Sequence, residues 1–253
     1  MRSTLIIAIL LFLGGVWAQK PTGGTVTAEV GLQGAINNIQ IAPIAGARVR
    51  YFLGDNLAAR IGLNLTSQSE TKRDYENPDG TGGVGEEKLS YFLFGFRPGV
   101  EYHFAGGEKL STFAGAQLIL ELTSAKTTRT NYAAGGYRAD FSQTIDGQAT
   151  IGGIPQNKST SFGLGLYSGF DWYFTEKLYL GIEWGLNFLS TSYGDVITKT
   201  SAGGITIETK QAGGRAVTSL SIPWGSCVWG ISSKNLLPHG QRGATRVAPR
   251  LSF

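Results

Sequence analysis

Apolar and polar side chains alternate with a period of two in eight separate stretches of the chain. The clearest is LAARIGLNLT at residues 57–66, in which five aliphatic residues alternate with small or polar ones. A period of two is typical of β-strands, because successive side chains point to opposite faces of a sheet. The pattern predicts strands at about residues 25–32, 45–53, 57–66, 92–104, 114–122, 162–174, 178–188 and, more weakly, 215–222.

The connections between these stretches alternate between short and long. Short turns lie at residues 53–56, 105–109 and 175–177, and longer connections rich in Gly, Thr, Asn and charge lie near 33–42, 67–88, 123–160 and 191–213. Tight turns at one end and long loops at the other are typical of outer-membrane barrels. A soluble sandwich with Greek-key crossings is not expected to sort its loops in this way.

The two faces of the predicted strands differ sharply in charge. The apolar face contains no Asp, Glu, Lys or Arg, whereas the other face has Gly at nearly every second position. Gly weakens an open strand, but it leaves room for large side chains inside a narrow closed barrel. We therefore expect the apolar face to meet lipid and the charged face to form a paired interior network. The predicted network consists of Glu29, Arg48, Arg50, Arg60, Arg97, Glu101, His103, Glu121, Asp171, Glu183 and Arg215.

Aromatic residues gather beside the short turns. Aromatic side chains form girdles where transmembrane strands cross the interface between lipid and water, although they also fill ordinary protein cores. The predicted girdle consists of Tyr51, Tyr102, Phe104, Trp172 and Phe174.

The first residues, MRSTLIIAILLFLGGVWAQK, have the features of an export signal. Arg2 provides a positive start, residues 5–16 are apolar, and a small-residue cleavage site ends at about Ala18. The apolar run is too short to cross a bilayer as a helix. We expect a signal peptide at residues 1–18, an outer-membrane barrel at 19–223 and a basic tail at 224–253.

The tail accounts for the net charge of +4, because it contains four Lys and Arg residues and no acid. The net positive charge therefore does not indicate a nucleic-acid-binding surface, and no nucleic-acid partner is expected. The tail is interpreted either as a periplasmic extension or an aberrant end, or as further strands. TRVAPRLSF at residues 245–253 alternates and ends in Phe, as barrel-insertion signals do, and it would raise the strand count to ten or displace the eighth strand. We expect eight strands and a tail.

Several stretches resemble a known family. RVRYFLGDNLAARIGLNL, GFRPGVEYHF and GLGLYSGFDWYFTEKLYLGIEWGLNF, together with the signal and the eight strands, look like the small outer-membrane β-barrel proteins related to OmpA and OmpX, in particular the barrel-only kind of Bacteroidota. The resemblance covers about residues 24–223 and is architectural. It implies an all-β, eight-stranded antiparallel up-and-down transmembrane barrel in the outer membrane, with both barrel termini in the periplasm. The two-domain members of the family have a peptidoglycan-binding domain after the barrel, and no such domain is expected here.

Few residues are candidates for catalysis. His103 lies on the charged face two residues from Glu101, where it is either a structural hydrogen-bonding group or a general base. It lies near the short turns, whereas outer-membrane enzymes place their catalytic groups at the extracellular rim. GTGGVGEE at residues 80–87 lacks the Lys of a phosphate loop, and DYENPDG at 74–80 lacks the spacing of a Ca²⁺ loop. The single cysteine, Cys227, makes a disulfide framework or a metal-thiolate site implausible.

The sequence therefore favours a non-enzymatic barrel with a plugged, charge-paired interior, without cofactor or metal. Its four extracellular loops would serve surface contact, adhesion or envelope assembly, with outer-membrane lipid, lipopolysaccharide and other envelope proteins as partners. A narrow passive pore is the alternative, and an outer-membrane lipid-modifying enzyme is a third hypothesis. A soluble ligand-binding barrel of the lipocalin type is the rival fold.

Overall fold

The computed structural model describes residues 21–35, 38–107, 109–133, 135–175, 177–221 and 226–233, with the backbone alone at 30–45, 105–106 and from 215 onward. These residues form β-strands and turns, and none of them belongs to a helix long and apolar enough to cross a membrane. The predicted signal peptide and the segment 245–253 lie outside the described residues. The expectation of an all-β protein is confirmed.

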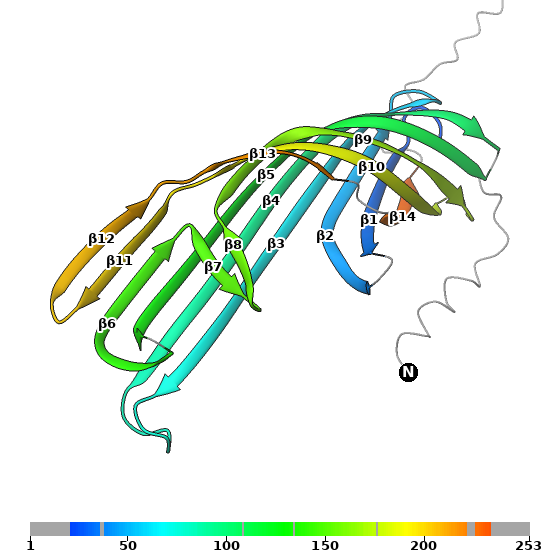
Figure 1. The fold of residues 1–253 in the computed structure, drawn as a ribbon. Coiled ribbons are helices and arrows are strands. Elements are labelled where there is room, and N and C mark those ends of the chain that lie inside the picture. Colours follow the sequence, from blue (N-terminus) through cyan, green and yellow to red (C-terminus); the bar gives the residue numbers. More distant parts are fainter. Residues whose placement is uncertain are drawn as a thin grey trace, which may run out of the picture.

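The strands, labelled as in Figure 1, are β1 (Val26–Ala35), β2 (Asn38–Phe52), β3 (Leu57–Tyr75), β4 (Val84–Gly106), β5 (Leu110–Ala133), β6 (Gly136–Asp146), β7 (Gln148–Ile151), β8 (Ile154–Asn157), β9 (Ser159–Tyr173), β10 (Leu178–Tyr193), β11 (Val196–Ala202), β12 (Ile205–Gln211), β13 (Arg215–Ser221) and β14 (Ser226–Ser233). Each of the eight predicted stretches falls on one of these strands.

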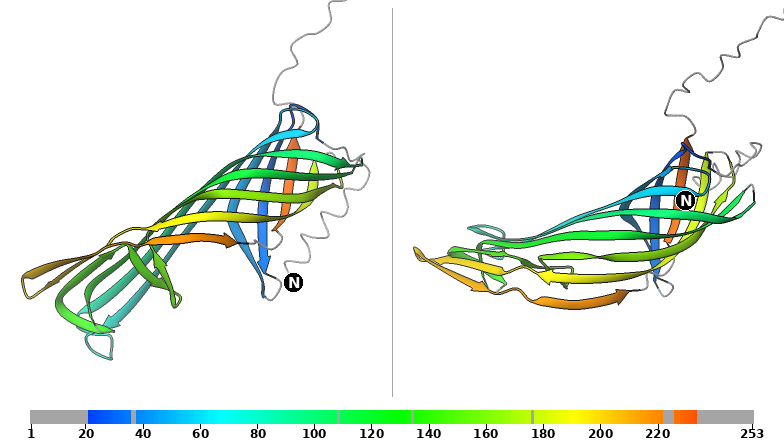
Figure 2. Two further views of the ribbon diagram at one scale, coloured as in Figure 1. Left: turned by 45° about the horizontal axis from the view of Figure 1, so that its top comes forward. Right: turned by 90° about the horizontal axis from the view of Figure 1, so that it is seen from above.

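Most of the strands belong to one large antiparallel sheet. Neighbouring strands pair from β1 through β5, β5 then pairs with β9, and β9 pairs with β10. The last described strand, β14, pairs with β10 on one side and with β1 on the other. The pairings therefore lead from β1 around to β14 and back, and these strands curl around a common axis at one end of the molecule (Figure 2). We call this end the ring.

The other end of the molecule is an open sheet that extends away from the ring (Figures 1 and 2). The distal halves of β3, β4 and β5 continue into it, and β6, β11 and β12 are added in that order beyond β5. The hairpin of β7 and β8 is a separate two-stranded sheet that contacts β4 and β5. We call this part the arm.

The expectation of long loops at residues 67–88, 123–160 and 191–213 is wrong, because these residues form the arm. These segments are mostly strand, and turns occupy only short parts of them. The connection expected near residues 33–42 is also mostly strand, because β1 ends at Ala35 and β2 begins at Asn38. Much of the arm is exposed on both faces, and all seven residues of β12 are exposed. Because neither face of such a strand needs to be apolar, the alternation that reveals a strand elsewhere is missing.

The end of the sheet also differs from the expected boundary at residue 223. Ser226–Ser233 form β14 inside the segment assigned to the tail, and β13 and β14 pair with successive parts of β10. The alternation in this segment is weak, so its strand conformation follows from backbone pairing with two neighbours rather than from a local pattern. The tail thus includes a strand that connects β10 to β1.

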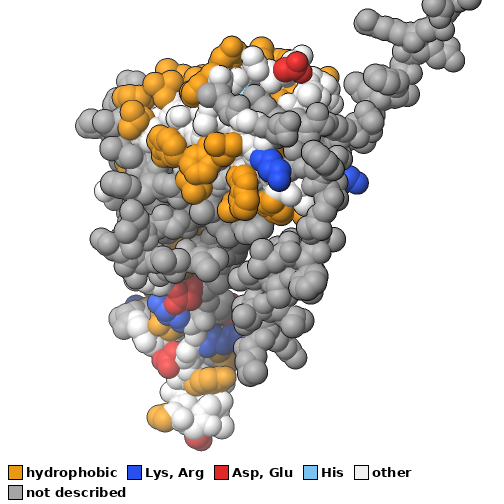
Figure 3. Space-filling model, turned by 90° about the vertical axis from the view of Figure 1, so that its right-hand side faces the viewer, with side chains coloured by type: hydrophobic (Ala, Val, Ile, Leu, Met, Phe, Trp, Pro, Cys, Tyr) orange, Lys and Arg blue, Asp and Glu red, His pale blue; other side chains and the backbone are white. Residues whose placement is uncertain are grey.

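The ring strands have their apolar residues outside and their charged residues inside. On β3, Ile61 and Leu65 are 48% and 50% exposed, whereas Arg60, the residue before Ile61, is 5% exposed. On β9, Leu164 is 55% exposed and Asp171 is fully buried. Figure 3 shows hydrophobic side chains spread over the described surface at the ring end, with some charged side chains among them and others farther along the arm. This distribution is the reverse of that in a soluble globular protein.

Candidate functional site

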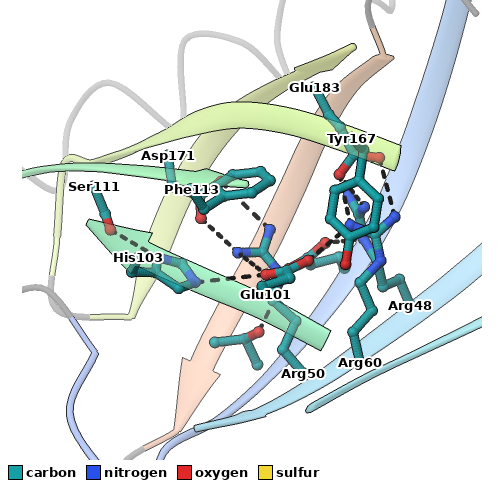
Figure 4. A network of polar contacts seen from close by, with 12 residues as sticks. Arg48, Arg50, Arg60, Glu101, His103, Ser111, Phe113, Tyr167, Asp171 and Glu183 are labelled. Atoms are coloured by element: carbon teal, nitrogen blue, oxygen red, sulfur yellow. Dashed lines mark hydrogen bonds and ion pairs between the residues drawn. The ribbon is translucent and has the colours of Figure 1, made fainter. Parts of the chain in front are cut away.

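The interior of the ring holds a network of buried charges (Figure 4). Arg50 of β2 is fully buried, and its Nη1 lies 2.6 Å from Asp171 Oδ2 and 3.3 Å from Glu101 Oε2. It also forms an ion pair with Glu29 of β1. One arginine from β2 therefore joins carboxylates from β1, β4 and β9, which connects walls of the ring that do not pair with each other.

Two further arginines extend this network through Glu183 of β10. Arg60 Nη1 of β3 lies 2.7 Å from Glu101 Oε1 and 2.7 Å from Glu183 Oε2, and Arg48 Nη1 lies 2.5 Å from Glu183 Oε2. Arg48 also pairs with Glu29. An uncompensated charge in such a place costs several kcal/mol, roughly, so the pairing is what allows these residues to be buried. The planar guanidinium, with several donors, suits a site where one cation meets several carboxylates.

The remaining predicted network residues lie nearby or outside the described side chains. Arg97 of β4 pairs with Glu121 of β5, as a separate and partly exposed pair nearer the arm. The backbone of Arg215 lies in β13, and its side chain is outside the described residues. The structure therefore brings Glu29, Arg48, Arg50, Arg60, Glu101, Asp171 and Glu183 together, with His103 at one end.

Buried aromatic rings complete the interior, and the predicted site did not include them. The Arg60 guanidinium lies 3.8 Å from the ring centroid of Tyr167, and Arg50 lies 5.0 Å from that of Phe113. Tyr179 donates a hydrogen bond to Glu29, and Arg50 lies 5.7 Å from the Tyr179 ring. Their positions on the charged face were the available signal, because an aromatic residue in phase with the arginines must also point inward.

Glycines on the inner face leave space for these large side chains. A Cβ on Gly115 would lie 2.5 Å from the Tyr167 ring, and one on Gly181 would lie 2.5 Å from Asp171 Oδ1. A Cβ on Gly169 would lie 2.7 Å from the Phe113 ring. The high Gly content of the charged face therefore has a packing cause, as the sequence pattern indicated.

His103 lies between a serine and a carboxylate. Its Nδ1 is 2.8 Å from Ser111 Oγ, and its Nε2 is 3.5 Å from Glu101 Oε2. The three side chains are fully buried, and Phe52 and Phe113 flank the imidazole with ring centroids 5.1 and 5.5 Å away. Because no substrate can reach Ser111 Oγ in this arrangement, the geometry supports a hydrogen-bonding role for His103 rather than general-base catalysis.

The aromatic residues beside the short turns point outward. Tyr51, Tyr102, Phe104 and Trp172 are between 39% and 57% exposed, and the Trp172 and Phe174 rings have centroids 5.9 Å apart. They come from β2, β4 and β9 and from the turn that follows β9. Outward-pointing side chains are one condition that the predicted girdle sets.

A second candidate site lies in the arm, where the β7–β8 hairpin covers the inner face of the sheet. A cavity of about 360 Å³ lies between them. Its polar lining comes from Lys72, Glu87, Thr127, Arg129, Gln148 and Thr150. Arg129 Nη2 lies 2.7 Å from Glu87 Oε1, and Arg129 Nη1 donates to Gln143 Oε1 at 2.5 Å, so its guanidinium already has partners.

The turn of the hairpin is held to the sheet by Glu70 of β3. The backbone N–H of Gly152 donates to Glu70 Oε2 at 3.0 Å, and Thr127 Oγ1 donates to the carbonyl oxygen of Gln148 at 3.0 Å. The hydrogen bond from Gly152 lowers the pKa of the Glu70 carboxyl below its ordinary value, with a smaller contribution from Lys72. The carboxylate form of Glu70 is therefore the form that holds the hairpin.

Among the described residues, no group of three or more His, Cys, Asp or Glu side chains is placed to hold a metal ion. No protein-family model matches the chain, and no curated protein matches it.

Proposed function

We propose that this protein is an integral outer-membrane β-barrel whose interior is plugged by paired charges. The observation that supports the proposal best is the inverted distribution of side chains in the ring. Aliphatic and aromatic residues cover its outside, while Arg50, Glu101 and Asp171 are fully buried inside it. In water, this arrangement would leave an apolar surface exposed and would desolvate charges with nothing gained.

The dimensions of the outer apolar surface fit a membrane. On β3 it runs from Leu57 to Leu65, which is nine residues, and a tilted transmembrane strand needs about 9–11. The ring of antiparallel pairings gives every spanning strand two neighbours, so that backbone N–H and C=O groups are paired within the protein, as a lipid environment requires. We read these pairings as an eight-stranded barrel in which β13 and β14 together form the last strand.

The rival fold, a soluble lipocalin-type barrel, has a different interior. Such a barrel keeps an apolar ligand cavity inside and a polar surface outside. Here the inside is occupied by the arginines, carboxylates and tyrosines of the network. The interior therefore has no space suited to an apolar ligand, and the membrane barrel is the better account.

The proposed role is structural and at the cell surface. The charge network makes the barrel a rigid base, and the arm is its extracellular part, where the sequence suggested loops. Surface contact, adhesion or assembly with other envelope proteins would then take place on the arm. The resemblance to barrels related to OmpA and OmpX favours the same location and no specific activity.

Fractionation and heat-modifiable migration test the proposal together. The protein expressed in a Gram-negative host should separate with outer membranes, and the unheated sample should migrate differently on an SDS gel from the boiled one, because intact membrane barrels resist SDS. Purified protein should also fold from urea into phosphatidylcholine vesicles with the same shift. A protein that stays soluble after export, and shows no shift with vesicles, would contradict the proposal.

A further inference from the structure

Two lysines lie on the outer face of the arm, directly beyond the apolar surface of the ring. Lys88 of β4 and Lys126 of β5 are exposed, and they share the outward face with Phe92 and Leu122 on the same strands. Each lysine is four residues beyond its apolar counterpart, which is about 13 Å along a strand. With a strand tilt of about 40°, this corresponds to about 10 Å along the barrel axis.

The strand register makes the two lysines diagonal neighbours. Lys126 lies opposite Ser90, and Lys88 lies opposite Thr128, so each lysine is two residues from the partner of the other. Within the described part of the chain neither lysine takes part in an ion pair, whereas the other outward cations nearby do: Lys158 lies 3.9 Å from Asp146 Oδ2, and Arg73 lies 3.1 Å from Glu86 Oε2.

The surroundings of the pair are polar and contain an excess of positive charge. Ser69, Ser90, Thr71, Thr128 and Thr144 supply hydroxyl groups in the same two rows of the outer face. Asp146 is opposite Lys126 on β6, but its ion pair is with Lys158. Two exposed lysines at diagonal positions, neither in an ion pair, leave positive charge on this part of the outer face that an anion can neutralise.

We propose that Lys88 and Lys126 bind the phosphate groups of an anionic lipid in the outer leaflet. This inference rests on the proposed membrane location. It adds to that proposal a lipid ligand for the outer face of the arm. The height of the lysines places their ammonium groups at the lipid headgroups, because the headgroup layer begins where the hydrocarbon surface ends. The hydroxyl side chains around them donate further hydrogen bonds to phosphate oxygens. A soluble anion would not require this fixed height above the apolar surface.

The test compares the full chain with the double variant Lys88→Gln/Lys126→Gln. The matched control is Lys109→Gln/Lys177→Gln, which removes the same charge from two exposed lysines at the short turns. All three proteins are folded into vesicles of phosphatidylcholine, without or with about 10% of diphosphoryl lipid A. The readout is the temperature at which the heat-modifiable form is lost.

We expect lipid A to raise this temperature for the natural chain and for the control, and to leave the Lys88→Gln/Lys126→Gln protein unchanged. Inorganic phosphate added to phosphatidylcholine vesicles should have no effect, whereas an equal effect would identify a free anion as the ligand and overturn the lipid assignment. Equal responses of the variant and the control would also overturn it. Failure of every protein to insert into phosphatidylcholine would instead contradict the proposed membrane barrel.

Discussion

At the scale of single residues, the direction of a side chain decides its environment. Ile61 and Arg60 are adjacent in the chain, yet Ile61 is 48% exposed on the outside and Arg60 is 5% exposed inside. In a strand this difference follows from the period of two, and it gives adjacent residues opposite responses to the same kind of substitution. The membrane proposal therefore makes sharp predictions at neighbouring positions.

Ile61→Arg tests the outer face. A charge on the lipid-facing surface of a transmembrane barrel costs about 2–4 kcal/mol near the midplane, so the variant should fail to fold into vesicles or should lose most of the folded form. Ile205→Arg is the control, because Ile205 is 68% exposed on the arm and should accept arginine without loss. Folded yields are measured by the heat-modifiable band. If Ile61→Arg folds as well as Ile205→Arg, the ring does not face lipid with this surface.

Arg60→Ala tests the inner face. It removes the cation that lies 2.7 Å from both Glu101 and Glu183, and breaking a buried pair in this way typically costs about 3–5 kcal/mol. Arg73→Ala removes an exposed arginine whose pair with Glu86 is worth at most about 1 kcal/mol. Urea unfolding in vesicles measures both free energies of unfolding. Equal small losses would show that the interior charges are solvated rather than buried.

At the scale of elements, the ring and the arm depend on different contacts. Ring strands have two backbone neighbours and a buried inner face, whereas the arm ends at β12, whose residues are all exposed. Two elements have particular roles: β14 pairs with both β10 and β1 and so connects them, whereas the β7–β8 hairpin covers the inner face of the arm.

Truncation tests the role of β14. A chain that ends at residue 225 lacks β14 and leaves β1 and β10 without their shared neighbour, so we expect no heat-modifiable form in vesicles. A chain that ends at residue 233 retains every described strand and should fold in vitro. Folding of the shorter chain would show that the ring does not need β14.

Acidification and substitution of Glu70 test the hairpin. The pKa of Glu70 is lower in the folded protein than its ordinary value of 4.5, so its contribution is present above pH 4.5 and is lost as the pH falls through the lowered pKa. We expect hydrogen exchange at the Gly152 amide to become faster, relative to its intrinsic rate, as the pH falls below 4.5 and through the lowered pKa. Glu70→Ala should show fast exchange already at pH 7, with Glu70→Gln between the two because its amide oxygen still accepts. A pH-independent protection would remove this role.

At the scale of the whole molecule, the interior decides between a plugged barrel and a pore. The arginines connect carboxylates across the ring, and aromatic rings fill the space between them. An eight-stranded barrel has an interior just wide enough for side chains to fill it. In the proposed membrane barrel, the arm would then carry the surface that other molecules meet, because buried side chains occupy the described interior of the ring.

Planar-bilayer recordings test the plugged interior. The natural chain should give no steady conductance steps at neutral pH, although its insertion is verified by the heat-modifiable band of the recovered protein. The physical reason is that ions would need to displace buried, mutually paired charges. Regular, reproducible steps from the inserted natural chain would favour the narrow pore instead.

Alternation along the chain determined the all-β class, the strand positions in the ring and the separation of apolar from charged residues, because each depends only on the two-residue period. It also placed arginines on β2 to β4 and most acids on later strands. The alternation did not determine which arginine pairs with which acid. Arg50 and Asp171 are 121 residues apart in the chain, and the curvature of the sheet brings them together. The arm and β14 likewise depended on tertiary structure: their strands lack a strong local pattern and form because a neighbouring strand offers its backbone N–H and C=O groups.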